Sequence, residues 1–212
     1  MLTLYFLRHG QTEFSRANAF CGSGLDPLLT PDGEEMAQAF AAAYAATPWS
    51  AIYCSPLRRA VATATPLSQR VNVPLQEREE LVEIGYGAWE GKSVDEVTRD
   101  FHDDYIRWQA DPAWNAPTGG ETATHIAHRV LRLLEDVQAR HDDGHVLLVS
   151  HKATIRIALC ALLGIDVGRF RFRLAAPVGS VSVVEFARQG PLLHRLADTK
   201  HLGERLASLP GT

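Results

Sequence analysis

The stretch Leu7–Thr12, with the sequence LRHGQT, follows the short apolar run Leu2–Leu7. The run is typical of a buried strand, and Arg8, His9 and Gly10 come where that strand would open into a loop. Glycine permits a sharp turn and a close approach of a ligand to the backbone. A histidine beside an arginine at a strand end can face an anion, although a single basic dipeptide more often follows a core strand simply as two solvated residues.

The chain repeats this arrangement after two other apolar runs. Val146–His151 is again an apolar strand with a histidine at its end, and Trp49–Cys54 is a third such run, followed by the sequence SPLRRA at Ser55–Ala60. A serine followed by proline is a typical helix start. We therefore expect Arg58 in a first helical turn, where free N–H groups and the helix dipole favour an anion, and Arg59 on a solvated face.

Helical and extended patterns alternate along the chain. We expect helices at about 30–46, from 55 onward, at 93–96, 118–140 and 152–163, strands at 2–7, 49–54, 73–79 and 145–150, and a hairpin of strands 181–186 and 192–196. This order predicts an α/β fold, a three-layer αβα sandwich around a mainly parallel sheet. Ligands in such sheets bind beyond the carboxyl ends of the strands, so His9, Arg58 and His151 can converge.

Two capping patterns define expected helix starts. Thr30 can cap a helix that begins at Pro31, and Thr118 with Glu121 has the spacing of a capping box. The remaining stretches are expected to be loops: 13–24, 81–91 and the tail after 198.

Composition and net charge limit the classes of protein to which the chain can belong. The chain has 212 residues, 46% hydrophobic residues and a formal net charge of -4. That charge argues against binding to nucleic acid or to an anionic membrane, so a phosphate site must be a local basic pocket. No apolar run approaches the ~18 residues of a membrane span, and no secretory signal is visible. The cysteines Cys21, Cys54 and Cys160 are predicted to be reduced thiols in a cytoplasmic protein.

One inserted segment interrupts the alternating pattern. We expect a single domain over residues 1–212, with a covering segment at about 92–120. Residues 100–114 within it are aromatic and acidic. These aromatic side chains could form a lid or pack locally, and we expect local packing.

The charged residues at the strand ends fit the requirements of phosphoryl transfer. A neutral imidazole such as that of His9 is a nucleophile at neutral pH. Arg8 and Arg58 offer forked donors that match phosphate oxygens, and His151 can donate another hydrogen bond. Glu83, in an apolar and glycine-rich loop, is a candidate general acid, because burial disfavours the charged form of a carboxyl group.

The LRHGQT stretch also resembles the signature of the histidine phosphatase superfamily, the phosphoglycerate mutase-like enzymes. The resemblance implies that His9 is the phosphorylated histidine and Arg8 a phosphate-binding arginine. It assigns the role of the second phosphate-binding arginine to Arg58. Because Arg59 follows directly, the alignment with the family motif leaves a shift by one residue open. It further implies that Glu83 is the acid of the LVEIGYGAWEG motif and that His151 is the second histidine. The similarity runs from the first strand to the helix after His151.

Three positions depart from the family pattern. Ser15 stands where members often carry an asparagine that binds phosphate, Cys21 where a polar residue such as glutamine is common, and Lys152 where glycine usually follows the second histidine. Ser15 and Cys21 are therefore candidates for altered outer contacts to the substrate. Lys152 either adds a cation to the pocket or turns to solvent.

These observations predict a hydrolase, a phosphomonoesterase of the phosphatase branch, that acts through a phosphohistidine without a metal or another cofactor. The expected substrate is a small phosphorylated metabolite such as a phosphoglycerate, phosphoserine, a sugar phosphate or α-ribazole phosphate. A cofactor-dependent phosphoglycerate mutase and a non-catalytic phospholigand-binding protein of this fold are the alternatives. The stretch 85–91 resembles the phosphatase version, and the segment between Glu83 and His151 is shorter than mutases usually have.

Overall fold

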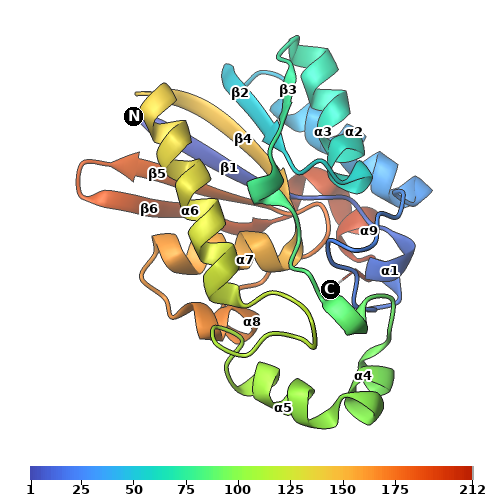
Figure 1. Ribbon diagram of the computed structural model, residues 1–212. Coiled ribbons are helices and arrows are strands. Elements are labelled where there is room, and N and C mark those ends of the chain that lie inside the picture. Colours follow the sequence, from blue (N-terminus) through green and yellow to red (C-terminus); the bar gives the residue numbers. More distant parts are fainter. Residues whose placement is uncertain (212) are drawn as a thin grey trace.

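The computed structural model describes residues 1–211, which form a six-stranded central sheet flanked by helices (Figure 1). The strands lie in the order β3-β2-β4-β1-β5-β6. Strands β1 to β4 are mutually parallel, whereas β5 runs antiparallel to both β1 and β6. The strands are β1 (Leu2–Arg8), β2 (Trp49–Cys54), β3 (Leu75–Glu77), β4 (Gly144–Ser150), β5 (Val181–Ala187) and β6 (Gly190–Asp198). The predicted α/β class with a mainly parallel sheet is confirmed.

Helices cover both faces of the sheet. The α-helices are α1 (Glu13–Arg16), α2 (Pro31–Tyr44), α3 (Arg58–Val71), α4 (Val94–Asp100), α5 (His102–Ala110), α6 (Ala123–Arg140), α7 (Lys152–Leu162), α8 (Phe170–Arg173) and α9 (Gly203–Ala207). The 3₁₀ turns are η1 (Glu79–Leu81), η2 (Gly87–Trp89), η3 (Val167–Arg169) and η4 (Lys200–Leu202). None of the described helices is long and apolar enough to cross a membrane.

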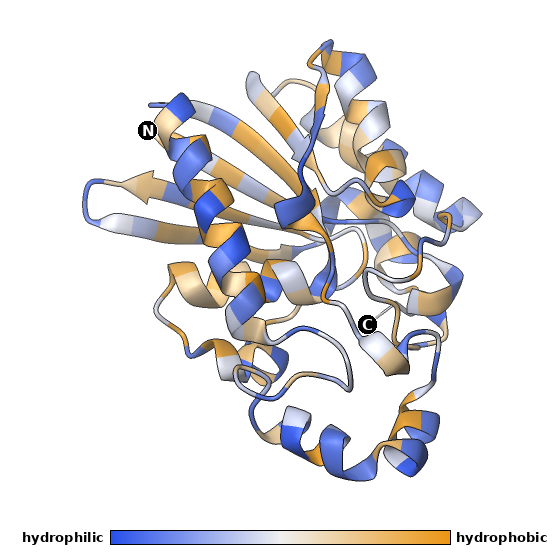
Figure 2. Cartoon of the chain, viewed as in Figure 1, coloured by the Kyte–Doolittle hydropathy of each residue, from blue (hydrophilic) through white to orange (hydrophobic). Residues whose placement is uncertain are grey.

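The alternating side chains of β4 explain why helices pack on both faces of the sheet. Val146 and Leu148 belong to a core cluster with α6 and α7, and Leu147 and Val149 belong to a second cluster with α2 and α3. Successive residues of a strand point to opposite faces, so a strand that is apolar throughout must be covered on both sides. Figure 2 shows the apolar strands between amphipathic helices.

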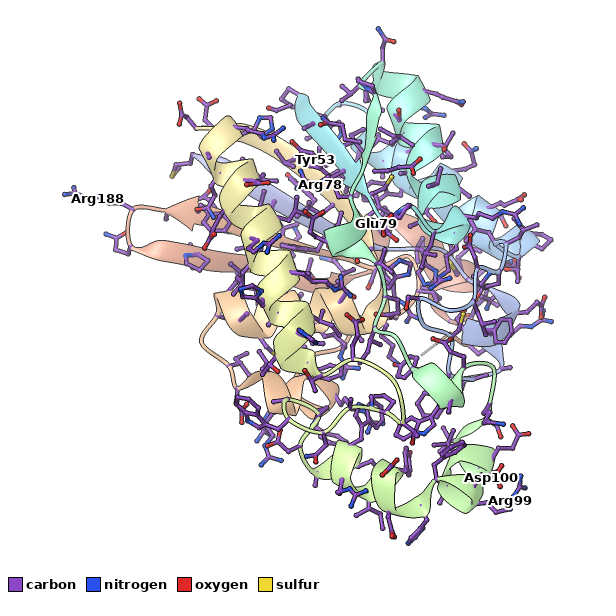
Figure 3. The ribbon with its side chains drawn as sticks, viewed as in Figure 1. Tyr53, Arg78, Glu79, Arg99, Asp100 and Arg188 are labelled. Atoms are coloured by element: carbon purple, nitrogen blue, oxygen red, sulfur yellow. The ribbon has the colours of Figure 1, made fainter. Side chains whose placement is uncertain are left out.

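The covering segment packs through aromatic rings on the loop after α1 and on η2. Phe20, Trp89, Val97, Tyr105 and Trp108 form a buried cluster between the loop after α1 and helices α4 and α5. Tyr105 and Trp108 of this segment are therefore packed as expected, whereas Trp114 is 77% exposed. Charged residues lie at the outside of the molecule: Figure 3 shows Arg99 and Asp100 at the outer end of α4, and Arg188 at the tip of the β5–β6 hairpin.

Several expected boundaries are wrong. The stretch 13–24 is not all loop, because Thr12 caps the short helix α1, and the tail after Asp198 contains η4 and α9. Helix α6 begins after Thr122 rather than Thr118, because Glu121 instead accepts a hydrogen bond from the Gly85 backbone at 2.9 Å.

The helix predicted from Ser55 begins three residues later, at Arg58. Leu57, with an extended backbone, is the N-cap residue, so Ser55 does not cap the helix. The Oγ of Ser55 instead accepts a hydrogen bond from the Leu57 backbone at 3.3 Å and lies 2.8 Å from Nε2 of His151. Thr30, by contrast, caps α2 as predicted, accepting a hydrogen bond from the Gly33 backbone at 3.1 Å.

Two glycines let the loop after β1 lie directly on the first turn of α2. A Cβ added to Gly10 would stand 2.3 Å from the carbonyl oxygen of Gly33, and a Cβ added to Gly33 would stand 2.2 Å from that of Gln11. Gly10 also donates a backbone hydrogen bond to Oγ1 of Thr63 on α3, at 3.0 Å. Helices α2 and α3 therefore fix the place of His9, which immediately precedes Gly10.

We predict that Gly33→Ala destabilises the protein by about 1–3 kcal/mol, because the new methyl group meets backbone that cannot yield without moving the loop. The expected loss opposes the usual gain of alanine over glycine inside a helix. Urea denaturation would measure it, with Gly24→Ala as control, because a Cβ there comes no closer than 3.3 Å to the Glu90 side chain. An equally stable Gly33→Ala protein would contradict the close contact.

Candidate active site

A pocket of about 300 Å³ opens beside the carboxyl ends of β1 and β4. The structure brings six of the eight predicted site residues to its wall: Arg8, His9, Ser15, Cys21, Glu83 and Lys152. Two predicted residues, Arg58 and His151, do not line it. Its volume suits a small ligand.

The ring of His9 is held in one tautomer. Its Nδ1 lies 2.8 Å from the carbonyl oxygen of Gly10. A carbonyl oxygen can only accept a hydrogen bond, so Nδ1 carries the proton and Nε2 keeps a free lone pair. Burial, together with the charges of Arg59 and Arg8, lowers the pKa of His9 well below its ordinary value. His9 is therefore neutral at neutral pH, with a nucleophilic nitrogen available.

Backbone carbonyls from distant segments hold Arg8. Its Nη1 donates to the carbonyl oxygens of Ala176 and Gly211, both at 2.7 Å. Burial lowers the pKa of Arg8 to about 10, so it remains a cation at neutral pH. Its buried Nε has no hydrogen-bond partner within the described chain. An anion in the pocket would supply that partner.

The second arginine of the pocket is Arg59, not Arg58. Arg58 is exposed at the first position of α3, whereas Arg59 is only 1% exposed and lines the pocket. The solvated face expected for Arg59 is therefore wrong, and so is the expectation that Arg58 faces an anion there. The error follows from the later start of α3, which turns the second arginine inward.

Three hydrogen bonds fix the guanidinium of Arg59. Its Nη1 and Nη2 donate to the carbonyl oxygens of Leu25 and Gly22, and its Nε donates to Nδ1 of His151 at 3.2 Å. A guanidinium carries five N–H donors. Two therefore have no hydrogen-bond partner among the described residues, although Nη1 also lies 3.8 Å from Oδ1 of Asp26.

His151 lies behind these residues rather than in the pocket. Its ring centroid is 5.1 Å from that of His9, and it is completely buried. Because Nδ1 accepts from Arg59, a neutral ring carries its proton on Nε2 and donates it to Oγ of Ser55. Burial, followed by the charge of Arg59, lowers the pKa of His151 well below its ordinary value. Both of its nitrogens therefore bond to protein atoms, which differs from the predicted direct contact with phosphate.

Glu83 is positioned by the start of α7. Its Oε1 accepts hydrogen bonds from the Ile84 backbone and from both the backbone and the hydroxyl of Thr154, at 2.9–3.1 Å. Its Oε2 accepts only one, from the Ala153 backbone at 3.1 Å. Oε2 is consequently the oxygen with capacity for a ligand.

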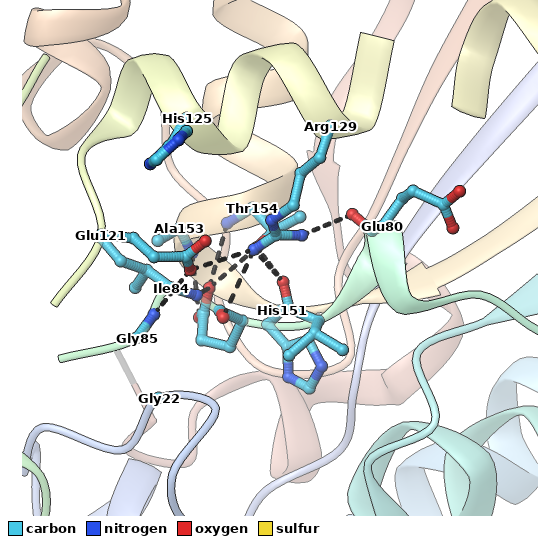
Figure 4. A network of polar contacts seen from close by, with 12 residues as sticks. Gly22, Glu80, Ile84, Gly85, Glu121, His125, Arg129, His151, Ala153 and Thr154 are labelled. Carbon is cyan, nitrogen blue, oxygen red and sulfur yellow. Dashed lines mark hydrogen bonds and ion pairs between the residues drawn. The ribbon is translucent and has the colours of Figure 1, made fainter. Parts of the chain in front are cut away.

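Arg129 holds the loop that carries Glu83. Figure 4 shows Arg129 reaching from α6 toward this loop. Its guanidinium donates to the carbonyl oxygens of Glu80 at 2.5 Å and Val82 at 2.7 Å, and pairs with Glu121 at 3.5 Å. The carboxylate of Glu83 is therefore fixed through both its backbone and its side chain.

The three departures from the family pattern lie in the pocket wall. The hydroxyl of Ser15 donates to the carbonyl oxygen of Thr12 at 2.9 Å, so its proton is already engaged. Burial raises the pKa of the Cys21 thiol to about 11, which keeps it protonated at neutral pH. Lys152 lines the pocket rather than turning wholly to solvent.

The pocket wall also contains residues that were not predicted from the sequence, among them Arg156 and Arg171. Arg156 lies four residues after Lys152, on the same face of α7, a spacing that could have indicated it. Arg171 belongs to the short helix α8, for which no sequence signal was apparent.

Comparisons with known proteins agree with this geometry. The family model described as the histidine phosphatase superfamily (branch 1) matches residues 4–199. Phosphoserine phosphatase 1 from Hydrogenobacter thermophilus is 32% identical over 204 residues, which cover 96% of each chain. Glucosyl-3-phosphoglycerate phosphatase from Mycolicibacterium vanbaalenii is 33% identical, over 87% of this chain and 83% of that protein.

Solved structures show the same architecture. Bacillus stearothermophilus YhfR superposes with a TM-score of 0.88 at 26% identity, covering 95% of this chain and 100% of the other. The mycobacterial glucosyl-3-phosphoglycerate phosphatase Rv2419c in complex with VO3 gives a TM-score of 0.84 at 28% identity, covering 93% and 99% of the two chains.

Adjacent arginines offer a matched test of the pocket. We predict that Arg59→Gln weakens binding of inorganic phosphate about 10- to 100-fold, the effect of losing charged hydrogen bonds. Arg58→Gln removes the same charge one residue away and should change affinity by no more than about twofold, because this exposed side chain is screened by solvent. Calorimetric titration would measure both, with thermal unfolding to verify folding. A larger loss in Arg58→Gln would overturn the assignment.

The buried histidines make stability depend on pH. The pKa values of His9 and His151 are lowered in the folded state, so the unfolded chain binds more protons below its histidine pKa of about 6.5. Their contribution to stability is present above pH 6.5 and is lost as pH falls. We predict that the free energy of unfolding drops between pH 7.5 and 5.5, by at most about 1.4 kcal/mol per pH unit for each histidine.

Urea denaturation across this pH range would test the effect. His151→Asn should reduce the slope, whereas replacing the exposed His128 by glutamine should leave it unchanged. A slope that His151→Asn does not alter would contradict the assignment.

Proposed function

The chain belongs to the histidine phosphatase superfamily (branch 1) and is a phosphomonoesterase, and we propose that its reaction passes through a phosphohistidine formed on His9. The observation that carries this proposal is the hydrogen bond from Nδ1 of His9 to the Gly10 carbonyl. It leaves the lone pair of Nε2 free, as a nucleophile requires. Arg8 and Arg59, in the same pocket wall, supply the cations that a phosphoryl group needs.

In the first step, Nε2 of His9 attacks phosphorus and the bond from phosphorus to the ester oxygen breaks. The free donors of Arg8 and Arg59 stabilise the charge on the equatorial phosphoryl oxygens. A proton carried on Oε2 of Glu83 passes to the leaving oxygen, which departs as an alcohol. Glu83 is then a carboxylate, and the phosphoryl group is bonded to His9.

In the second step, Glu83 accepts a proton from water as the water oxygen attacks phosphorus. The bond from phosphorus to Nε2 breaks, inorganic phosphate forms, and His9 regains its free lone pair. Glu83 is again protonated, so the cycle closes without a net change in the protein. We propose that no metal ion is needed, because arginine side chains provide the positive charge.

His151 contributes through its neighbours. It bonds to Arg59 and Ser55 and lies against His9, so we assign it a positioning role. It keeps the donors of Arg59 directed into the pocket.

The names of the relatives indicate the substrate class. Similar proteins are named phosphoserine phosphatase, glucosyl-3-phosphoglycerate phosphatase and α-ribazole phosphatase. We propose for this chain a small phosphorylated metabolite, as the volume of the pocket also favours. These names favour hydrolysis over a mutase reaction. The three free cysteines support a reducing compartment such as the cytoplasm.

His9→Ala tests the nucleophile. We predict a loss of turnover of at least about 10³-fold, as expected when the nucleophile of a catalytic unit is removed. Brief incubation with a ³²P-labelled ester should give an acid-labile phosphoenzyme in the native protein and none in His9→Ala. His128→Ala serves as the matched control, because this histidine is exposed on α6. Labelling that persists in His9→Ala would refute the assignment.

Glu83→Gln tests the acid. An alkyl phosphate leaves as a strongly basic alkoxide, whereas nitrophenolate leaves readily without a proton. In single-turnover phosphorylation, the loss for the alkyl ester should therefore exceed that for the aryl ester, within the ~10²–10⁴-fold range of general acid catalysis. Equal losses for the two leaving groups would mean that Glu83 only positions the site.

A further inference from the structure

The pocket is lined by a second group of basic side chains, and the proposed reaction does not use them. Lys152 and Arg156 come from α7 and Arg171 comes from α8. Helix α7 begins directly after His151, and Arg156 lies one helical turn further from the strand end. Helix α7 thus leads from the phosphoryl site to α8, which packs against it (Figure 1).

The basic side chains on α7 form no ion pair within the described part of the chain. The Lys152 side chain makes no hydrogen bond or ion pair within residues 1–211, although it is half-buried. Arg156 is 8% exposed, and its guanidinium donates to the backbone carbonyl of Arg171. Its buried Nε has no partner among the described residues. Buried N–H donors are normally satisfied, so this group is prepared for a ligand.

Aromatic packing fixes the third cation. The guanidinium of Arg171 lies 4.0 Å from the ring centroid of Trp108, and that ring is itself held in the buried aromatic cluster of the covering segment. The contact orients the guanidinium without neutralising it. Its buried Nη1 has no hydrogen-bond partner in residues 1–211.

The pocket holds more positive charge than one phosphoryl group requires. Four arginines and Lys152 line it, and Glu83 is its single carboxylate among the described residues. A phosphate monoester brings about two negative charges at neutral pH. Burial, followed by repulsion from Arg8 and Arg156, lowers the pKa of Lys152 to about 7. A second anion beside these groups would relieve this repulsion.

We propose that Lys152, Arg156 and Arg171 form a subsite for a second anionic group of the substrate, a carboxylate or a second phosphoryl group. The inference rests on the proposed phosphatase function and deepens it. It states that the substrate carries two separate anionic groups on a small scaffold, and that a phosphorylated neutral alcohol is a poor substrate.

Matched three-carbon esters test this subsite. Glycerol 3-phosphate and 3-phosphoglycerate differ only in that a carboxylate replaces a hydroxymethyl group, and glycerol 1,3-bisphosphate offers a second phosphoryl group. We expect kcat/KM for one of the two doubly anionic esters to exceed that for glycerol 3-phosphate about 10- to 100-fold. The better of the two identifies the second anion as carboxylate or phosphoryl. Hydrolysis of p-nitrophenyl phosphate reports the phosphatase reaction itself.

Variants connect the preference to the residues. Arg171→Gln and Lys152→Ala should each reduce the ratio of kcat/KM between the doubly anionic ester and glycerol 3-phosphate by about tenfold. Arg173→Gln is the control, because it removes an exposed arginine from the same helix α8. Lys152→Ala keeps the test valid if Arg171→Gln fails to fold, because the Lys152 side chain has no hydrogen bonds to lose.

The outcomes separate the two proposals. Turnover of p-nitrophenyl phosphate with no preference for either doubly anionic ester would overturn the subsite and leave the phosphatase intact. A preference that both variants retain would overturn the assignment to these cations. Failure to hydrolyse any ester would overturn the proposed function, and the subsite with it.

Discussion

The hydrogen bond from Nδ1 of His9 to the carbonyl oxygen of Gly10 decides which ring nitrogen faces the pocket. That carbonyl is in place because the loop after β1 packs on α2 at Gly33 and because the Gly10 backbone bonds to Thr63 on α3. The chemistry of one imidazole thus depends on the packing of two helices against the end of the central strand. A side chain at either glycine would shift this loop, and the ring with it.

Burying several cations around a neutral histidine costs free energy, and the fold offsets it with backbone oxygens. Carbonyls of Ala176 and Gly211 accept from Arg8, and carbonyls of Gly22 and Leu25 accept from Arg59. Such dipoles orient the guanidinium groups while leaving their net charge for a ligand. Burial, followed by the charge of Arg59, lowers the pKa of His9 and His151 and keeps both rings neutral, which a nucleophile at neutral pH requires.

The periodicity of apolar residues in the sequence predicts most of the strands and helices. Because a parallel sheet brings the carboxyl ends of its strands together, the residues that follow the strands are predicted to form the site. His9 is predicted for that reason and through the family motif, and Glu83 through its apolar, glycine-rich loop and the same motif. Arg59 was misassigned because Ser55, a plausible helix cap, bonds to a histidine distant in sequence and delays the helix start. The position of Arg171 depends on tertiary packing against Trp108, which no local pattern encodes.

The account depends most on the identity of the attacking nitrogen. The phosphoenzyme formed within milliseconds of mixing with substrate can be quenched in alkali and digested, and NMR of the ¹⁵N-labelled phosphopeptide reports which nitrogen carries phosphorus. The account predicts phosphorus on Nε2 of His9, with Nδ1 unmodified. Phosphorus on Nδ1, or on any other residue, would contradict it.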